Sequence, residues 1–249
     1  MVQHMTFQMA ERITEDYYSQ FCGIELSRWK QGSCFSCSAA RGEKLNGFGC
    51  RYAIYILIKG GLCAAAYSPE HKTFMERLKG YDRDELIAAA GQRFKLKRMK
   101  LMMFEREAIS QYGGARILRA PDYPCYEAFF RRVFPGVDPD GWLHEYFIRK
   151  TAKEYFTGYF VNSKIVSVCD APDMPYMEDK IQHTGICTLE EERRKGYAAC
   201  TAALAAHHLM EMGICPQWEC GAENIASISL AKSIGYREYG DAYIFEEWD

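Results

Sequence analysis

The sequence lacks a dominant charge, a long apolar run and any low-complexity tract. Lysine and arginine number 31 against 33 aspartates and glutamates, so the formal net charge is −2. This balance gives no electrostatic footprint for nucleic acid. No apolar stretch approaches the ~20 residues that span a bilayer, and residues 1–7 lack the basic, apolar and cleavage regions of a signal peptide. We therefore expect a cytoplasmic protein that binds neither nucleic acid nor membrane.

The eleven cysteines form no regular spacing pattern, and their number is odd. Most have apolar neighbours, which is typical of reduced, buried cysteines that act as small hydrophobic residues. Cys34 and Cys37 form a single C-x-x-C, and with Cys50 and Cys63 they could supply four thiolates. A structural zinc site usually has a second closely spaced ligand pair, and none follows. We therefore predict a pair of thiols at a strand edge and no metal site, with zinc as the alternative.

The length of 249 residues suffices for one large domain or two smaller ones, and the chain divides near 113–114. Apolar periodicity and turn residues predict these elements in the first half: a helix at 5–22, a hairpin of strands 52–58 and 62–67, helices at 71–78 and 84–90, and a strand at 96–104. In the second half they predict a strand at 115–118, helices at 126–134 and 141–153, a hairpin of strands 155–161 and 164–169, a strand at 181–188, a helix at 197–212, a strand at 215–220, a helix at 224–234 and a strand at 236–246. This order indicates an α+β fold.

Basic residues alternate with apolar ones just before and within the strand at 96–104. Arg93, Lys95 and Lys97 form the alternating set. One hypothesis is a basic strip for an anionic partner. The favoured interpretation is the solvated face of an edge strand, where lysines also oppose aggregation.

One segment combines a strand end, a short basic loop and a helix start. An apolar run precedes it, an alanine-rich helix follows it, and Gly196 stands in the loop between them. Backbone N–H groups and a helix N-terminus converge at such a junction and favour a phosphate. Arg193, Arg194 and Lys195 add charge of the right sign. The segment therefore predicts a site for a pyrophosphate-bearing cofactor.

The same segment resembles a known family. Arg193-x-x-Gly196-x-Ala198 is similar to the (Gln/Arg)-x-x-Gly-x-(Gly/Ala) signature of the GNAT superfamily of acyl-CoA-dependent N-acyltransferases. Three further matches follow it in the sequence: Trp218–Cys220 in a strand, Asn224-x-x-Ser227 at a helix start and Gly235-Tyr236 at the end of that helix. The resemblance is strongest over residues 155–240, and the order of elements over 115–249 also fits.

The resemblance implies acetyl-CoA as co-substrate and assigns it a binding site. The diphosphate would lie on the backbone amides of the loop, where a glycine at 196 allows close approach. The strand 181–188 would lie beside the pantetheine arm and splay from the strand 215–220. The residues expected to contact the coenzyme are Ile186, Cys187, Thr188, Arg193, Arg194, Lys195, Gly196, Tyr197, Ala198, Asn224 and Ser227. Asn224 is also a candidate helix cap, and both roles can hold at once.

The implied reaction is direct attack of a primary amine on acetyl-CoA in a ternary complex. The amine must first lose a proton, and the N–H of Cys187 or Thr188 is the expected donor to the oxyanion. His183 is the predicted base because it lies on the strand next to the expected thioester; a hydrogen-bonded structural histidine is the alternative. Gln182 stands where some relatives carry a catalytic glutamate, so a base that acts through water stays open.

The predicted general acid departs from the family pattern. Many members place a tyrosine four residues before the Gly-aromatic pair, and that position here is Ala231. Ser227, Tyr236 or water are the remaining candidates. This departure supports an alternative function from another class, a non-catalytic acyl-CoA-binding or regulatory module.

The loop 170–179 is rich in carboxylates. Its acidic residues are Asp170, Asp173, Glu178 and Asp179. They predict either attraction of a cationic amine substrate or an ordinary exposed acidic hairpin loop.

Together these patterns predict two domains. Residues 115–249 would form a GNAT-like N-acetyltransferase domain with a mixed, mostly antiparallel sheet flanked by helices. Residues 1–114 would form an α/β companion domain that shapes the acceptor pocket, and a degenerate copy of the same fold is one hypothesis for it. The acceptor would be a primary amine of a small molecule or peptide. Its identity and the oligomeric state, a homodimer included, stay open.

Overall fold

The computed structural model describes residues 5–28, 31–170 and 172–248. Its strands are β1 (Gln31–Cys37), β2 (Arg51–Lys59), β3 (Gly61–Tyr67), β4 (Lys97–Phe104), β5 (Ala115–Ile117), β6 (Thr157–Val161), β7 (Lys164–Cys169), β8 (Ile181–His183), β9 (Ile186–Thr188), β10 (Cys215–Gly221) and β11 (Tyr236–Glu247). Its α-helices are α1 (Phe7–Cys22), α2 (Lys72–Arg77), α3 (Arg83–Arg93), α4 (Tyr123–Val133), α5 (Leu143–Ala152), α6 (Tyr197–Glu211) and α7 (Ile225–Ser233). The expected elements are present with ends within three residues of those predicted, apart from the strand at 181–188.

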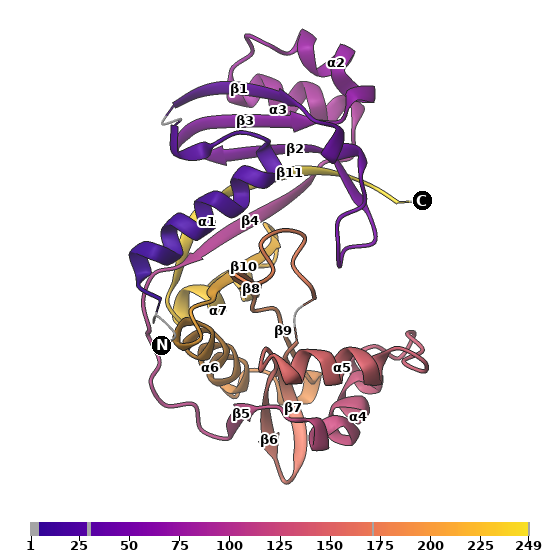
Figure 1. Ribbon diagram of the computed structural model, residues 1–249, viewed down its shortest axis with the longest axis vertical. Helices are drawn as coiled ribbons and strands as arrows, with labels where there is room; N and C mark the ends of the chain where they lie inside the picture. Colours follow the sequence, from indigo (N-terminus) through magenta and orange to yellow (C-terminus); the bar gives the residue numbers. More distant parts are fainter. Residues whose placement is uncertain (1–4, 29–30, 171, 249) are drawn as a thin grey trace.

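The strands form two sheets. The large sheet has the order β1-β3-β2-β11-β4-β10-β8, and the small sheet has the order β5-β6-β7-β9. Figure 1 shows the large sheet running through the upper and middle parts of the molecule and the small sheet below it, beside α4 and α5. Most neighbouring strands are antiparallel, and helices cover both sheets. The expected α+β fold is confirmed.

Strand β11, from the end of the chain, lies between β2 and β4 of the first half. It pairs antiparallel with both over most of its length. The large sheet therefore contains strands from both sides of residue 114, and the division into domains 1–114 and 115–249 stays a prediction. What the topology adds is that the two halves share one sheet.

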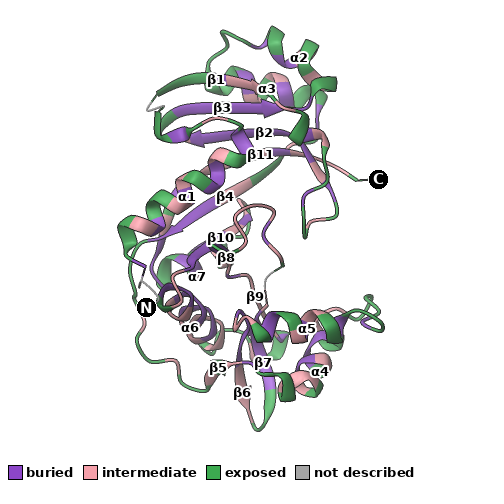
Figure 2. Ribbon diagram, viewed as in Figure 1, coloured by how far each residue is buried: buried purple, intermediate pink, exposed green. Residues whose placement is uncertain are grey.

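The β2–β3 hairpin has two apolar faces because successive side chains in a strand point to opposite sides. Tyr55 and Leu57 belong to the core under α1, whereas Ile54 and Ile56 belong to the core with α2 and α3. Figure 2 shows β2 and β3 buried along most of their length. This arrangement explains why β2 reads as a continuous apolar run in the sequence.

Helix α1 packs on the large sheet against β4 and β10 (Figure 1). The Thr6 side chain accepts a hydrogen bond from the Met9 N–H at its start, and Gly23 ends it with a left-handed φ of 61°. Its buried face includes Tyr17, Tyr18 and Phe21. A helix of the first half thus covers β10, a strand of the second half.

The prediction of an edge strand at 96–104 is wrong. Strand β4 lies inside the large sheet between β11 and β10. Its lysines instead pair across to β11: Lys97 with Glu246 at 3.0 Å and Lys100 with Asp241 at 3.0 Å. The periodicity of a single strand reports one solvated face and does not distinguish an edge from the interior.

The expected single strand at 181–188 is divided between the two sheets. Its first part, β8, pairs parallel with β10 in the large sheet, and its second part, β9, pairs antiparallel with β7 in the small sheet. Thr184 lies at the division, where its N–H and its hydroxyl both donate to the Gln217 carbonyl, at 2.8 and 2.9 Å. Beyond it the chain turns away from β10, so the two sheets separate at this point.

The small sheet packs on α4 and α5 through aromatic side chains. Tyr126 stacks on Phe147 with ring centroids 4.7 Å apart, and Phe156 lies within 6.1 Å of both. Leu209 of α6 belongs to the same core. This core holds α4 and the strand β9 on the same side of the division at Thr184.

Among the described residues, no helix is both long and apolar enough to cross a membrane.

Gly235, between α7 and β11, provides a test of this fold. It has a φ of +109°, and a Cβ there would lie 1.7 Å from the Arg106 carbonyl oxygen. We expect Gly235→Ala to lower the free energy of unfolding by about 2–4 kcal/mol, measured by urea denaturation. Gly80→Ala is the matched control, since Gly80 has a φ of +99° and no atom within 4 Å of its Cβ position. Equal losses in both variants would contradict the close approach.

Candidate active site

The loop before α6 has the backbone of an anion-binding turn. Arg194 and Gly196 have positive φ values of 62° and 83°. The first N–H that bonds back into the helix is that of Cys200, which donates to the Gly196 carbonyl at 3.1 Å. The amides from Arg194 to Ala199 therefore have no helical acceptor. A Cβ at Gly196 would meet no protein atom within 4 Å, so the space in front of these amides is open.

The side chains of the loop add positive charge. Lys195 pairs with Glu192 at 2.8 Å. In the described part of the chain, neither Arg193 nor Arg194 pairs with a carboxylate; Arg193 instead donates to the Thr188 carbonyl at 3.4 Å. Tyr197 stacks on Tyr159 of the small sheet, with centroids 4.4 Å apart, and so secures the helix start. The loop keeps two exposed guanidinium groups for an anionic ligand.

Two cavities join the loop to the division between the sheets. The first, of about 400 Å³, is bordered by Thr188, Arg193 and Ala198 near the loop. The second, of about 600 Å³, opens between β9 and β10. Both cavities share four lining residues: Ile186, Cys187, Asn224 and Ser227. They form one groove that leads from the loop before α6 to the splayed strands.

The register of β9 decides which of its amides face this groove. The Leu189 N–H donates to the Val166 carbonyl at 3.0 Å, so Leu189 and Val166 form a hydrogen-bonded pair between the two strands. Such pairs recur at every second residue of an antiparallel ladder, so Cys187 and Val168 form the next one. The N–H of Cys187 therefore points to β7. The N–H groups of Ile186 and Thr188 point the other way, into the groove. Of the two expected oxyanion donors, only Thr188 has its amide on the correct side.

The 600 Å³ cavity has aromatic walls and acidic polar groups. Its aromatic lining residues come from α4, α5, their connection and β10: Tyr126, Phe130, Phe134, Trp142, Tyr146 and Trp218. Its carboxyl-bearing residues are Asp170, Asp173 and Glu219. None of the described residues that line it is arginine, lysine or histidine. Gly47 of the first half also borders it, which links that half to the cavity.

Glu219, on β10, is a functional candidate that the sequence analysis missed. Tyr18 of α1 donates a hydrogen bond to its carboxylate at 3.0 Å, and Gln217 donates to the Tyr18 hydroxyl at 2.7 Å. Burial raises the pKa of the Glu219 carboxyl to about 7, although the bonds from Tyr18 and Gln217 oppose the rise. A half-buried carboxyl with a pKa near neutrality, facing a cavity, is suited to accept a proton.

His183, the predicted base, lies close to Glu219 but is poorly suited to that role. Its Nε2 accepts the backbone N–H of Glu219 at 3.1 Å, so its free lone pair is already used. Its proton then lies on Nδ1, which is buried and has no partner among the described residues. Burial lowers the pKa of His183 to about 4. The contacts match the structural histidine named as the alternative.

Ser227, Asn224 and Tyr236, three further predicted site residues, differ in their access to the groove. Ser227 lines both cavities, and its Oγ accepts the Trp218 indole N–H at 3.1 Å. Asn224 also lines both, and its side chain accepts the Ser227 N–H, so it caps α7 as expected. Tyr236 is buried and bonded to the Thr184 hydroxyl at 2.7 Å, and it lines neither cavity.

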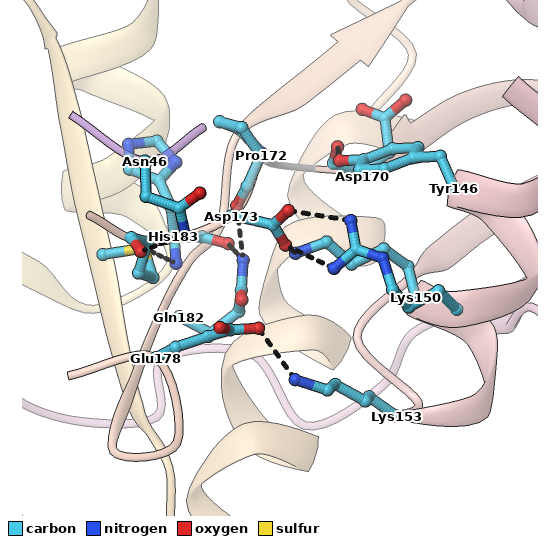
Figure 3. A network of polar contacts seen from close by, with 12 residues as sticks. Asn46, Tyr146, Lys150, Lys153, Asp170, Pro172, Asp173, Glu178, Gln182 and His183 are labelled. Carbon is cyan, nitrogen blue, oxygen red and sulfur yellow. Dashed lines mark hydrogen bonds and ion pairs between the residues drawn. The ribbon is translucent and has the colours of Figure 1, made fainter. Parts of the chain in front are cut away.

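The carboxylates of the loop 170–179 do not act as one acidic patch. Asp173 pairs with Arg149 at 2.8 Å and with the buried Lys150 at 2.7 Å, and these bonds hold its pKa near 2. Glu178 pairs with Lys153 at 2.8 Å. Figure 3 shows both pairs, which anchor the loop to α5 and the residues after it. The charges of Asp173 and Glu178 are therefore already balanced.

Asp170 differs from its neighbours in this loop. It follows β7 directly and accepts a hydrogen bond from Tyr126 at 2.9 Å. No ion pair of the described residues includes it, and burial raises its pKa to about 6. In Figure 3 it lies beside Tyr146, apart from the contacts of Asp173. Asp170 and Glu219 are thus two carboxyls that border one cavity and have no counter-ion among the residues that the structure describes.

Comparison with known proteins agrees with this geometry. The family model for GNAT acetyltransferase matches residues 150–245. An uncharacterized N-acetyltransferase, YdfB, from Bacillus subtilis (strain 168) is 40% identical over 60 residues, which cover 24% of this chain and 23% of that protein. The similarity therefore spans about a quarter of the length of that curated relative.

Two solved structures have a similar fold. A GNAT-family acetyltransferase from Colwellia psychrerythraea has a TM-score of 0.53 at 15% identity, over 74% of this chain and 76% of that one. A GCN5-related N-acetyltransferase from Sphaerobacter thermophilus has a TM-score of 0.51 at 14% identity, over 79% and 60%. At these identities the likeness concerns the fold.

The fold, the anion-binding loop and the splayed strands define a protein of the GNAT-fold class. Within that class, residues 150–245 match the model of the GNAT acetyltransferase family, which is a family of acyltransferases. The resemblance found in the sequence is confirmed.

The bond from Tyr18 to Glu219 leads to a prediction about pKa. Because this bond favours the ionised carboxylate, we expect Tyr18→Phe to raise the pKa of Glu219 above its value of about 7. The pKa can be measured by NMR on the protein labelled at the glutamate side-chain carboxyl carbon, with Glu219→Gln to assign the signal. Tyr239→Phe is the control, since Tyr239 stacks on Tyr18 but its hydroxyl has no partner among the described groups. An unchanged pKa in Tyr18→Phe would refute the tuning role.

Proposed function

We propose that this protein transfers an acetyl group from acetyl-CoA to a primary amine of a small molecule or peptide, by direct attack within a ternary complex. The observation that carries the proposal is the position of Glu219. It supplies a carboxyl with a pKa near neutrality at one end of a groove whose other end is an anion-binding loop.

The groove fits acetyl-CoA in two respects. Open space lies in front of Gly196 and the free amides at the start of α6, which suits a diphosphate. The groove-facing amides of Ile186 and Thr188 have no partner strand on their side, which suits the amide groups of the pantetheine arm. The diphosphate would lie on the amides of Arg194 to Ala198, and Asn224 would contact the arm from α7.

Glu219 is the proposed general base, in place of His183. At pH 8 its carboxylate takes a proton from the acceptor ammonium, because an amine without a lone pair cannot attack. The amine nitrogen then forms a bond to the thioester carbonyl carbon. The second proton leaves the nitrogen for solvent water as the tetrahedral intermediate collapses. The carbon–sulfur bond breaks with its electron pair on sulfur, so coenzyme A departs as a thiolate. The products are the N-acetylated amine and coenzyme A.

Backbone and hydroxyl groups complete the proposed site. The Thr188 N–H is the proposed donor to the oxyanion, since it points into the groove. Ser227 is the proposed donor to the departing sulfur, because its oxygen accepts from Trp218 and its own O–H is left to donate. Tyr236 is less suited, since it is buried and bonded to Thr184.

The proposal is tested by incubating the protein with acetyl-CoA and a broad panel of amines while free thiol is measured. Amine-dependent thiol release is the expected result. Tight binding of acetyl-CoA without thiol release would instead support a non-catalytic acyl-CoA-binding module. Absence of binding would exclude both functions.

Glu219→Gln tests the base directly. We expect kcat to fall roughly 10²- to 10⁴-fold, because glutamine cannot accept the proton. The folded protein holds the Glu219 proton more tightly than an unfolded chain, since its pKa is about 7 rather than the ordinary 4.5. Stability is therefore lost as pH rises from about 4.5 to 7, and the variant should unfold at a higher temperature than the parent at pH 8.

Glu223→Gln is the matched control for this variant. It removes one carboxylate from an exposed position in the turn after β10. Its thiol release and its melting temperature should both stay near those of the parent. A Glu219→Gln protein that keeps the parent's kcat would exclude Glu219 as the base, even if the acetyl transfer itself were real.

Gly196→Trp tests the coenzyme site. The indole would fill the open space in front of the loop amides, so we expect at least a tenfold weaker binding of coenzyme A in calorimetry. Gly80→Trp is the control for backbone strain, because Gly80 also has a positive φ and open space at its Cβ position. If the two variants bind coenzyme A with equal affinity, the loop is not the phosphate site.

A further inference from the structure

We infer that the acceptor is an aliphatic diamine: one ammonium binds at Asp170 while the other amine is presented to Glu219. This inference rests on the proposed function and narrows its substrate to a chemical class. It makes Asp170 a residue that selects the substrate and takes no part in the proton transfer.

The first support is the unbalanced charge of the cavity. Asp170 and Glu219 both border it, and neither has a cationic partner among the described residues. Three basic residues near the loop 170–179, Arg149, Lys150 and Lys153, are already paired with Asp173 and Glu178. A carboxylate withdrawn from water is costly unless a cation accompanies it. Two such carboxylates and no basic lining residue favour a ligand that carries two positive charges.

The second support is the separation of the two carboxyls by the fold. Asp170 follows β7 of the small sheet, whereas Glu219 belongs to β10 of the large sheet. The groove runs between these sheets, beyond their division at Thr184. One carboxyl therefore lies on each wall, so two amines at the ends of one chain can reach both.

The third support is the aromatic lining between them. Tyr126 holds Asp170 by a hydrogen bond, and Tyr146 and Trp142 border the same cavity. Aromatic faces attract an ammonium group, and they also pack well against methylene groups. An apolar spacer between two amines matches this surface better than a peptide backbone, whose amide groups would lack partners there.

The test compares α,ω-diaminoalkanes of three to eight methylenes with n-alkyl monoamines of equal length. Rates of thiol release give kcat/KM for each amine with the parent protein. We expect the best diamine to exceed its matched monoamine at least tenfold, since an ion-paired hydrogen bond in a sheltered site commonly contributes that much. Equal kcat/KM values for diamines and monoamines in the parent protein would overturn the inference without any variant.

Asp170→Asn assigns the preference to one residue. We expect its diamine-to-monoamine ratio of kcat/KM to fall to near one through a rise in KM for the diamine. Asp179→Asn is the matched control, because it removes a carboxylate from an exposed position of the same loop that does not border the cavity. A diamine preference that survives in a folded Asp170→Asn protein would exclude Asp170 as the selecting residue.

The two proposals fail in different ways. Turnover of monoamines and diamines alike would leave the acetyl transfer standing and overturn the diamine inference. If no amine is turned over, calorimetry with the diamine in the presence of coenzyme A tests the diamine-binding site separately from catalysis. Binding that Asp170→Asn abolishes would support the site, and absence of binding in the parent would overturn it.

Discussion

The structure depends on one division of the backbone, at Thr184. Two bonds from this residue to the Gln217 carbonyl hold β8 beside β10, and the next residues leave to pair with β7 instead. Without this separation β9 and β10 would form a continuous ladder, and their amides would bond to each other. Because β9 and β10 do not bond to each other, a groove lies between them. The free amides of the groove and the exposure of Glu219 to the cavity follow from this separation.

The second constraint is the burial of Glu219 under the first half of the chain. Helix α1 covers β10 and provides Tyr18, while β11 ties the strands of the first half to those of the second. Burial raises the pKa of Glu219, and the bonds from Tyr18 and Gln217 limit the rise. The chemistry proposed for residues 150–245 therefore depends on residues far outside the family match.

Much of the fold could be predicted because local patterns decide it. The hairpin at Gly60, the cap at Asn224 and the left-handed turn at Gly196 each follow from a few neighbouring residues. The edge position given to β4 and the unbroken strand at 181–188 were wrong, because pairing partners lie far away in the sequence. For the site, the residues proposed to bind the coenzyme belong to a motif, whereas Glu219 belongs to none. A lone acidic residue between Trp218 and Cys220 in a buried strand was the one available signal.

The sequence by itself determined the backbone of the proposed coenzyme site, because a glycine loop before a helix leaves free amides that suit an anion. It also determined which residues can titrate. Only the tertiary structure decided which of them carry a balanced charge. Asp173 is neutralised by Arg149 and Lys150, whereas Asp170 and Glu219 have no counter-ion in the described part of the chain. The physical reason is that a carboxyl's pKa depends on its solvation and on the charges around it, and both are set by segments that meet only in the folded chain.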